Sequence, residues 1–158
     1  VTHATPLFVT AMLVLIGVGF SIGNWLGGRL ADRSVTGTLK GFLALLIVIM
    51  AAIPWLARSE WGAALSMVVW GAATFAVVPP LQMRVMRVAS DAPGLSSSVN
   101  IGAFNLGNAL GAAAGGAVIQ AGLGLNMVPV MGATIAGLGL LLVVLSSRRE
   151  RETLCAAE

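Results

Sequence analysis

The sequence predicts an all-α membrane protein with five transmembrane helices, and three observations support this fold class. The 158 residues are 58% hydrophobic and only 9% charged, whereas a soluble domain carries about 25% charged residues to keep its surface wetted. The mean hydropathy of the chain is +0.95. The apolar residues also gather in long runs between short polar turns, and a run of about 20 apolar residues can cross a bilayer.

Five apolar runs follow one another along the chain, and the residues that bound them favour helix ends. Pro6 precedes the first run, where its fixed backbone angle suits the first helical turn. Pro79 and Pro80 bend or end the third run. The predicted helices cover about residues 7–26, 41–56, 61–78, 95–120 and 127–145. We expect residues 1–147 to form a partial transmembrane bundle and residues 148–158 to form a polar cytoplasmic tail.

The basic residues of the turns predict how the helices are oriented. Lys and Arg in short loops favour the cytoplasmic side of a membrane, and most of them fall in alternate turns. These basic residues are Arg29, Arg33, Lys40, Arg84, Arg87, Arg148, Arg149 and Arg151. The chain is therefore expected to be a multi-pass protein of the plasma (inner) membrane, with its N-terminus outside and its C-terminus in the cytoplasm. The same pattern explains the net charge of +3 without a nucleic-acid partner.

Two helices carry glycines at four-residue spacing, which places the glycines on one face of each helix. Helices in lipid associate by close packing, and small residues allow their backbones to approach. These stripes either slide along another half of a transporter or pack statically within the bundle. The first stripe consists of Gly19, Gly23 and Gly27, and the second consists of Gly107, Gly111 and Gly115.

Each glycine-rich helix is followed along the chain by an aliphatic helix. The two pairs of helices, 7–26 with 41–56 and 95–120 with 127–145, would cross the membrane in opposite directions. Inverted repeats of this kind are typical of secondary transporters. Such repeats would each contain three helices, and the first repeat would then lack its first helix. The chain also begins with Val1, only a few residues before the first predicted helix. We therefore expect the chain to be part of a longer protein.

Polar residues inside the predicted helices are candidates for substrate binding. Ser66, Trp70 and Thr74 fall within a narrow arc of the third helix, and Asn105 and Asn108 lie three residues apart on the fourth. A mostly apolar wall with a few polar groups suits a small amphipathic ligand. The alternatives are a packed seam on the third helix and hydrogen bonds between helices for the two asparagines.

Enzymatic and metal-dependent functions lack their residues in this sequence. His3 is the one histidine and Cys155 is the one cysteine, so neither a metal site nor a nucleophile–base pair is indicated. We expect no cofactor. No acidic or basic residue lies in the middle of a predicted span, although such residues usually mark ion relays.

The turn after the first helix carries a recognisable motif. Residues 28–33, GRLADR, resemble the Gly-x-Leu-Ala-Asp-Arg cytoplasmic signature of the major facilitator superfamily, and residues 24–28 and 100–111 are similar to its drug and sugar efflux branch, the arabinose efflux permease-like proteins. The family motif continues with Gly and a basic cluster, whereas this chain continues with residues 34–37, SVTG. This degenerate form is typical of the second copy of the motif, in the C-terminal half.

The resemblance implies that the five helices are the last five of a twelve-helix fold. The first and fourth helices would then pack against a missing N-terminal half, the second and fifth would face the lipid bilayer, and the third would line the cavity. It also implies a cytoplasmic gating motif formed by Gly28, Asp32 and Arg33. Asp32 either latches a moving helix by accepting hydrogen bonds at its N-terminus or is an ordinary solvated acid.

The function that the resemblance implies is secondary active transport: export of small molecules such as drugs or sugars by proton antiport and alternating access, with drug resistance as one consequence. The alternative is a membrane remnant or accessory subunit that does not transport and packs against partner helices.

Overall fold

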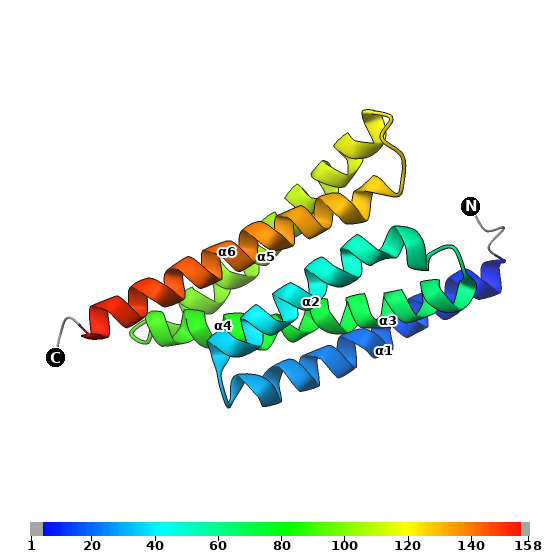
Figure 1. Cartoon of the computed structure of the whole chain (residues 1–158). Helices are drawn as coiled ribbons and strands as arrows, with labels where there is room; N and C mark the ends of the chain where they lie inside the picture. Colours follow the sequence, from blue (N-terminus) through cyan, green and yellow to red (C-terminus); the bar gives the residue numbers. More distant parts are fainter. Residues whose placement is uncertain (1–4, 156–158) are drawn as a thin grey trace.

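The computed structural model describes residues 5–155, which form α-helices joined by short turns (Figure 1). Side chains are described up to Arg149. No strand occurs within the described residues, and the prediction of an all-α fold is confirmed. The helices are α1 (Pro6–Ala31), α2 (Val35–Leu56), α3 (Glu60–Ala76), α4 (Val78–Val88), α5 (Pro93–Gln120) and α6 (Met127–Cys155).

Four stretches of the described chain are long and apolar enough to cross a membrane. They are α1, α2, the combined α3 and α4, and α6 as far as Arg149. The predicted fourth span corresponds to α5, which has 28 residues and is therefore long enough to cross. Its many Gly, Ala, Ser and Asn residues make it less hydropathic, and it is not among these four.

Helices α1, α2 and α3 begin where hydroxyl side chains cap their first backbone N–H groups. The Thr5 hydroxyl accepts a hydrogen bond from the Phe8 N–H at 3.3 Å. The Ser34 hydroxyl accepts one from the Gly37 N–H at 3.0 Å, so α2 begins at Val35 and not near the predicted residue 41. A capped N-terminus of this kind allows a helix to start within polar residues.

The third predicted span is longer than expected. The prolines at positions 79 and 80 lack the N–H groups that would continue the ladder of α3, so α3 ends at Ala76. Only Val77 separates α3 from α4, however, and the backbone of Val77 has helical φ and ψ angles. The two helices therefore form one bent span that continues to Val88.

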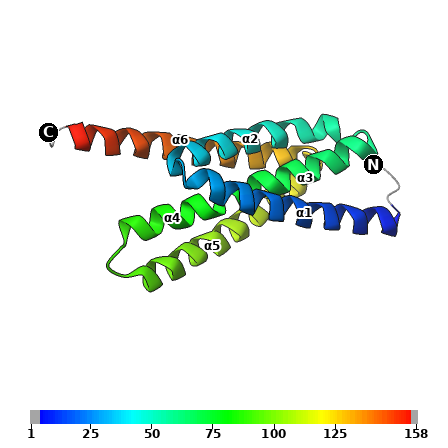
Figure 2. The ribbon, with the colours of Figure 1, turned by 90° about the horizontal axis from the view of Figure 1, so that it is seen from below.

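The helices pack in a chain of neighbours. Helix α1 lies against α3, α3 against α2, and α2 against α6, while α5 contacts only α4 and α6 among the described residues. Figure 1 shows α5 and α6 as a hairpin beside the other helices, and Figure 2 shows the same arrangement from below. The predicted polar tail starts as a helical continuation of α6 through Cys155, and residues 156–158 lie outside the described part.

The turns that carry most basic residues lie at one end of the bundle. The α1–α2 turn, the α4–α5 turn and the C-terminal end of α6 share this end, which we call the basic end (Figure 1). The α2–α3 and α5–α6 turns lie at the opposite end. Near the basic end, Ala31, Val35, Leu39 and Val77 form a small buried cluster that ties α1, α2 and the α3–α4 junction together.

Candidate functional site

The first glycine stripe is covered by α3 of the same chain. Gly19, Gly23 and Gly27 are all buried. A Cβ atom at Gly19 would lie 2.5 Å from the carbonyl oxygen of Val68, and one at Gly23 would overlap the backbone of Ala72. Of the two alternatives for this stripe, static packing within the bundle describes the structure, because glycines without side chains let α3 approach; the face is therefore not open to a missing half of the protein.

The second glycine stripe is open in the chain described here. A Cβ atom at Gly107 or Gly111 would meet no atom within 4 Å, and one at Gly115 would touch only the Val128 side chain, at 3.4 Å. The two stripes, which look alike in the sequence, thus lie in different surroundings. Only the second presents a smooth face, at Gly107 and Gly111, that no described helix covers.

The three candidates on α3 differ in how far they are buried. Ser66 is fully buried, and its hydroxyl donates a hydrogen bond to the Ala63 carbonyl oxygen at 2.8 Å. Ser66 thus has no exposed surface in this arrangement, and its role in substrate binding stays a prediction. The Thr74 hydroxyl donates to the Trp70 carbonyl oxygen at 2.7 Å, and both residues are half-buried.

An aromatic cluster joins α1 to α3 at the same level. The Phe20 ring stacks on Phe75, with centroids 4.0 Å apart. It also meets the Trp70 ring at a centroid distance of 6.3 Å and a tilt of 52°. Tilted and offset aromatic pairs of this kind stabilise a contact beyond simple area burial. The packed-seam alternative thus describes the Trp70 side chain in this structure.

A polar cluster joins α4 to α5, and its member Gln82 was not among the candidates from the sequence. Asn100 is buried, and its side-chain amide donates a hydrogen bond to the Gln82 side-chain oxygen. The Gln82 amide in turn donates to the Ser97 hydroxyl at 2.9 Å. An amide in an apolar environment is costly unless it is paired. The available signal was therefore Gln82, two residues after Pro80 within an apolar run.

A shallow concavity opens beside this polar cluster. Its volume is about 320 Å³, and it is lined by Leu81 of α4 and by Asn100, Ala103, Phe104, Gly107 and Asn108 of α5. Its residues on α5 recur at three- and four-residue spacing and so share one helix face. This concavity, which we call the α4–α5 concavity, therefore includes the open face at Gly107.

The structure does not bring the five predicted binding residues together. Asn108 lines the α4–α5 concavity, but Asn105 is exposed and is not among its lining residues. Within the described residues α3 makes no contact with α5, so Trp70 and Thr74 lie apart from both asparagines. Spacing along one helix could not reveal that these two helices are separated.

The predicted gating motif lies at the basic end of the bundle. Asp32 and Arg33 are exposed and Gly28 is half-buried. The N-terminus of α2 is capped by Ser34, and no described residue forms an ion pair with the Asp32 carboxylate. In the preceding turn the Arg29 guanidinium lies over the Trp25 ring, 5.5 Å from its centroid, a distance at which cation–π attraction acts.

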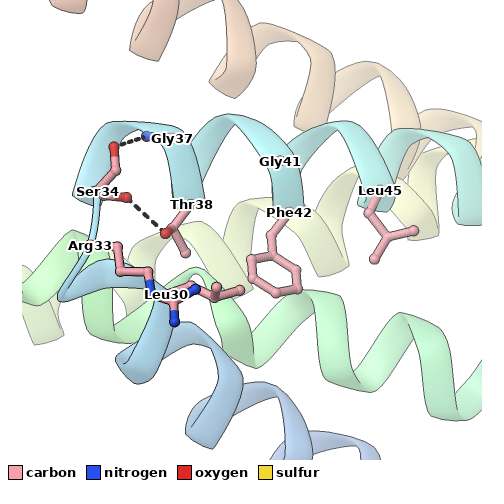
Figure 3. A pocket seen from close by; sticks show the side chains of 8 residues that line it. All are labelled: Leu30, Arg33, Ser34, Gly37, Thr38, Gly41, Phe42 and Leu45. Carbon is pink, nitrogen blue, oxygen red and sulfur yellow. Dashed lines mark hydrogen bonds between the residues drawn. The ribbon is translucent and has the colours of Figure 1, made fainter.

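Beside the motif lies a second concavity, between α1 and α2, with a volume of about 370 Å³. Figure 3 shows its lining, with Arg33 and Ser34 at the turn and Phe42 and Leu45 further along α2. Among residues 5–149, whose side chains the structure describes, there is no group of three or more His, Cys, Asp or Glu residues that could hold a metal ion.

The fold and these contacts define the class of protein. Helices of membrane length that pack through glycines and aromatic rings, with amide side chains gathered at a concave face, form a polytopic α-helical membrane protein. The comparisons with known proteins narrow this class.

Over 157 residues, 99% of its length, the chain is 82% identical to the inner membrane transport protein YdhP of Escherichia coli K12. It is 28% identical over 145 residues to the MFS-type transporter YfhI of Bacillus subtilis, and 29% identical over 140 residues to a "Probable sugar efflux transporter" of Helicobacter pylori J99. The chain spans 40% of the length of YdhP and 36% of the other two. No protein-family model matches the chain, and no solved structure matches it.

The chain is thus similar to membrane transporters, one of them of the major facilitator (MFS) type, in agreement with the resemblance of its motif at residues 28–33. Its coverage of these relatives is consistent with the C-terminal portion that the resemblance implies.

Proposed function

We propose that this chain is the C-terminal transmembrane portion of a secondary transporter that exports small molecules such as drugs or sugars by proton antiport. Its work is differential binding between inward-open and outward-open states. Similarity to named transport proteins supports transport in general, and the name of the Helicobacter pylori relative supports sugar efflux in particular. The N-terminus would lie outside and the C-terminus in the cytoplasm, which agrees with the gathering of basic turns at one end (Figure 1).

The α4–α5 concavity carries this proposal. It combines an aromatic ring, Phe104, with the amides of Asn100 and Asn108, and an amide offers both donors and acceptors to a hydroxylated or amphipathic molecule. Gln82 holds the Asn100 amide in place by a hydrogen bond. The substrate would thus bind Asn108 and Phe104 directly, while Gln82 acts as a positioning residue.

The open glycine face of α5 supports contact between this helix and another part of the transporter. Gly107 and Gly111 are exposed on α5, and an uncovered smooth face suits a second bundle that approaches closely. Because the chain spans 40% of YdhP, we propose that the remaining part of the transporter covers this face and closes the concavity. Gly28, Asp32 and Arg33 would act as the cytoplasmic gate between the two parts.

Export assays on the complete gene product test the proposal. Asn108→Ala removes one side-chain amide from the concavity, and the loss of a neutral hydrogen bond corresponds to about a two- to tenfold drop in export efficiency. Asn105→Ala is the matched control, because Asn105 lies on the same helix but outside the concavity. The measurement is efflux of a fluorescent drug and of a labelled sugar from cells with equal membrane levels of each variant.

Export that is unchanged by Asn108→Ala for all exported substrates would overturn the assignment of the concavity. Equal losses for both variants would instead favour the original interpretation of the two asparagines as a pair. If export is driven by proton antiport, an ionophore that collapses the proton gradient should stop it. Export that persists under that condition would contradict proton antiport.

A further inference from the structure

The concavity between α1 and α2 at the basic end is an apolar groove with one charged residue at its end. Leu30 of α1 and Phe42 and Leu45 of α2 form its apolar wall (Figure 3). Gly41, also in the lining, has nothing within 4 Å of the position that a Cβ atom would occupy. The groove therefore extends from the turn along α2, toward the interior of the membrane, with open space above the glycine.

The Ser34 and Thr38 hydroxyls of the groove bond to the backbone, whereas Arg33 is the charged side chain of its lining. The Ser34 hydroxyl accepts the Gly37 N–H at 3.0 Å, and the Thr38 hydroxyl donates to the Ser34 carbonyl oxygen at 2.8 Å (Figure 3). Arg33 is exposed, and within the described residues no acidic side chain pairs with it. Its guanidinium can therefore bind an anion.

The surrounding turn is also basic. Arg29, Arg33 and Lys40 outnumber the single acid Asp32, which is exposed and does not line the groove. A cationic end followed by an apolar wall matches a molecule with a negative head and a hydrocarbon chain. Juxtamembrane basic residues attract anionic lipids in the same way, by about 1 kcal/mol for each Lys or Arg near the surface.

We propose that this groove binds one anionic phospholipid of the leaflet at the basic end, with its phosphate at Arg33 and an acyl chain along Leu30, Phe42 and Leu45. The lipid would fill the space between α1 and α2 and so brace the turn that carries the gating motif. This site is independent of the proposed transport role, because it requires only that the basic end lies at a membrane surface.

Native mass spectrometry of the complete protein in mild detergent tests the site. The probes are phosphatidylglycerol and phosphatidylcholine with identical acyl chains. The wild-type protein should retain phosphatidylglycerol preferentially, and Arg33→Gln should weaken that retention about fivefold, while Arg33→Lys keeps it. Arg58→Gln, which removes a base from the turn at the opposite end, should leave retention unchanged.

A second variant tests the apolar wall without changing any charge. Gly41→Leu places a side chain in the open space of the groove and should displace the acyl chain, which lowers phosphatidylglycerol retention. Gly17→Leu is its control, because Gly17 on α1 also has nothing within 4 Å and does not line the groove. Equal retention of the two lipids by the wild-type protein, or retention unaffected by both Arg33→Gln and Gly41→Leu, would overturn the proposal.

Discussion

Substitution of Gly23 by Ala should destabilise the bundle, because α3 lies directly against this position. The added methyl group would lie within 2.7 Å of the Ala72 Cα atom and carbonyl carbon and closer still to its oxygen. Backbone atoms cannot rotate away as a side chain can, so α1 and α3 must separate. Overpacking of this kind costs about 1–3 kcal/mol, and a backbone overlap belongs at the upper end of that range.

The helix propensity of alanine offsets part of this cost. Alanine is favoured over glycine in a helix interior by about 1 kcal/mol, so the expected net loss for Gly23→Ala is about 1–2 kcal/mol. Gly17→Ala is the matched control on the same helix. It adds a methyl group where no atom lies within 4 Å, so the propensity term acts alone and stability should rise by up to about 1 kcal/mol.

The free energy of unfolding of the complete protein can be followed by tryptophan fluorescence as sodium dodecyl sulfate replaces a mild detergent. The chain contributes four Trp residues to this signal. Gly23→Ala should unfold at a lower mole fraction of the denaturing detergent than the wild-type protein, and Gly17→Ala at an equal or higher one. Identical unfolding curves for both variants would refute the close α1–α3 contact.

Three further predictions use the same measurement. Ser34→Ala removes the hydroxyl that caps the Gly37 N–H and should cost about 1 kcal/mol; no loss would mean that water replaces the cap. Asn100→Leu leaves the Gln82 side chain without one of its partners and should cost about 1–3 kcal/mol. Adding Gln82→Leu to that variant should cost less than the sum of the single changes, and strict additivity would show that the two amides are not coupled. Gly111→Ala should destabilise the complete protein if a companion bundle covers α5 as we propose, whereas a neutral or stabilising effect would leave that face exposed to lipid.

Several features of this protein follow from the sequence because they depend on composition and local spacing. A chain with 9% charged residues cannot cover a soluble surface, so the membrane class needed no tertiary information. The GRLADR motif at residues 28–33 likewise indicated the kind of transporter to which the comparisons find the chain similar. The start of α2 could also have been predicted, because Ser34 is a favourable capping residue for the Gly37 N–H. The polar residues that follow Ser34 placed the predicted start near residue 41 instead.

The tertiary structure decided which helix meets which, and with that the surroundings of every candidate residue. The stripes at Gly23 and Gly111 have the same spacing, yet only the first is buried, because α3 packs on α1 and no described helix packs on that face of α5. Spacing places a residue on a helix face, but the neighbour of that face is chosen by long-range packing of the whole bundle. For the same reason the pairing of Gln82 with Asn100 across α4 and α5 became visible only when the two helices were placed side by side.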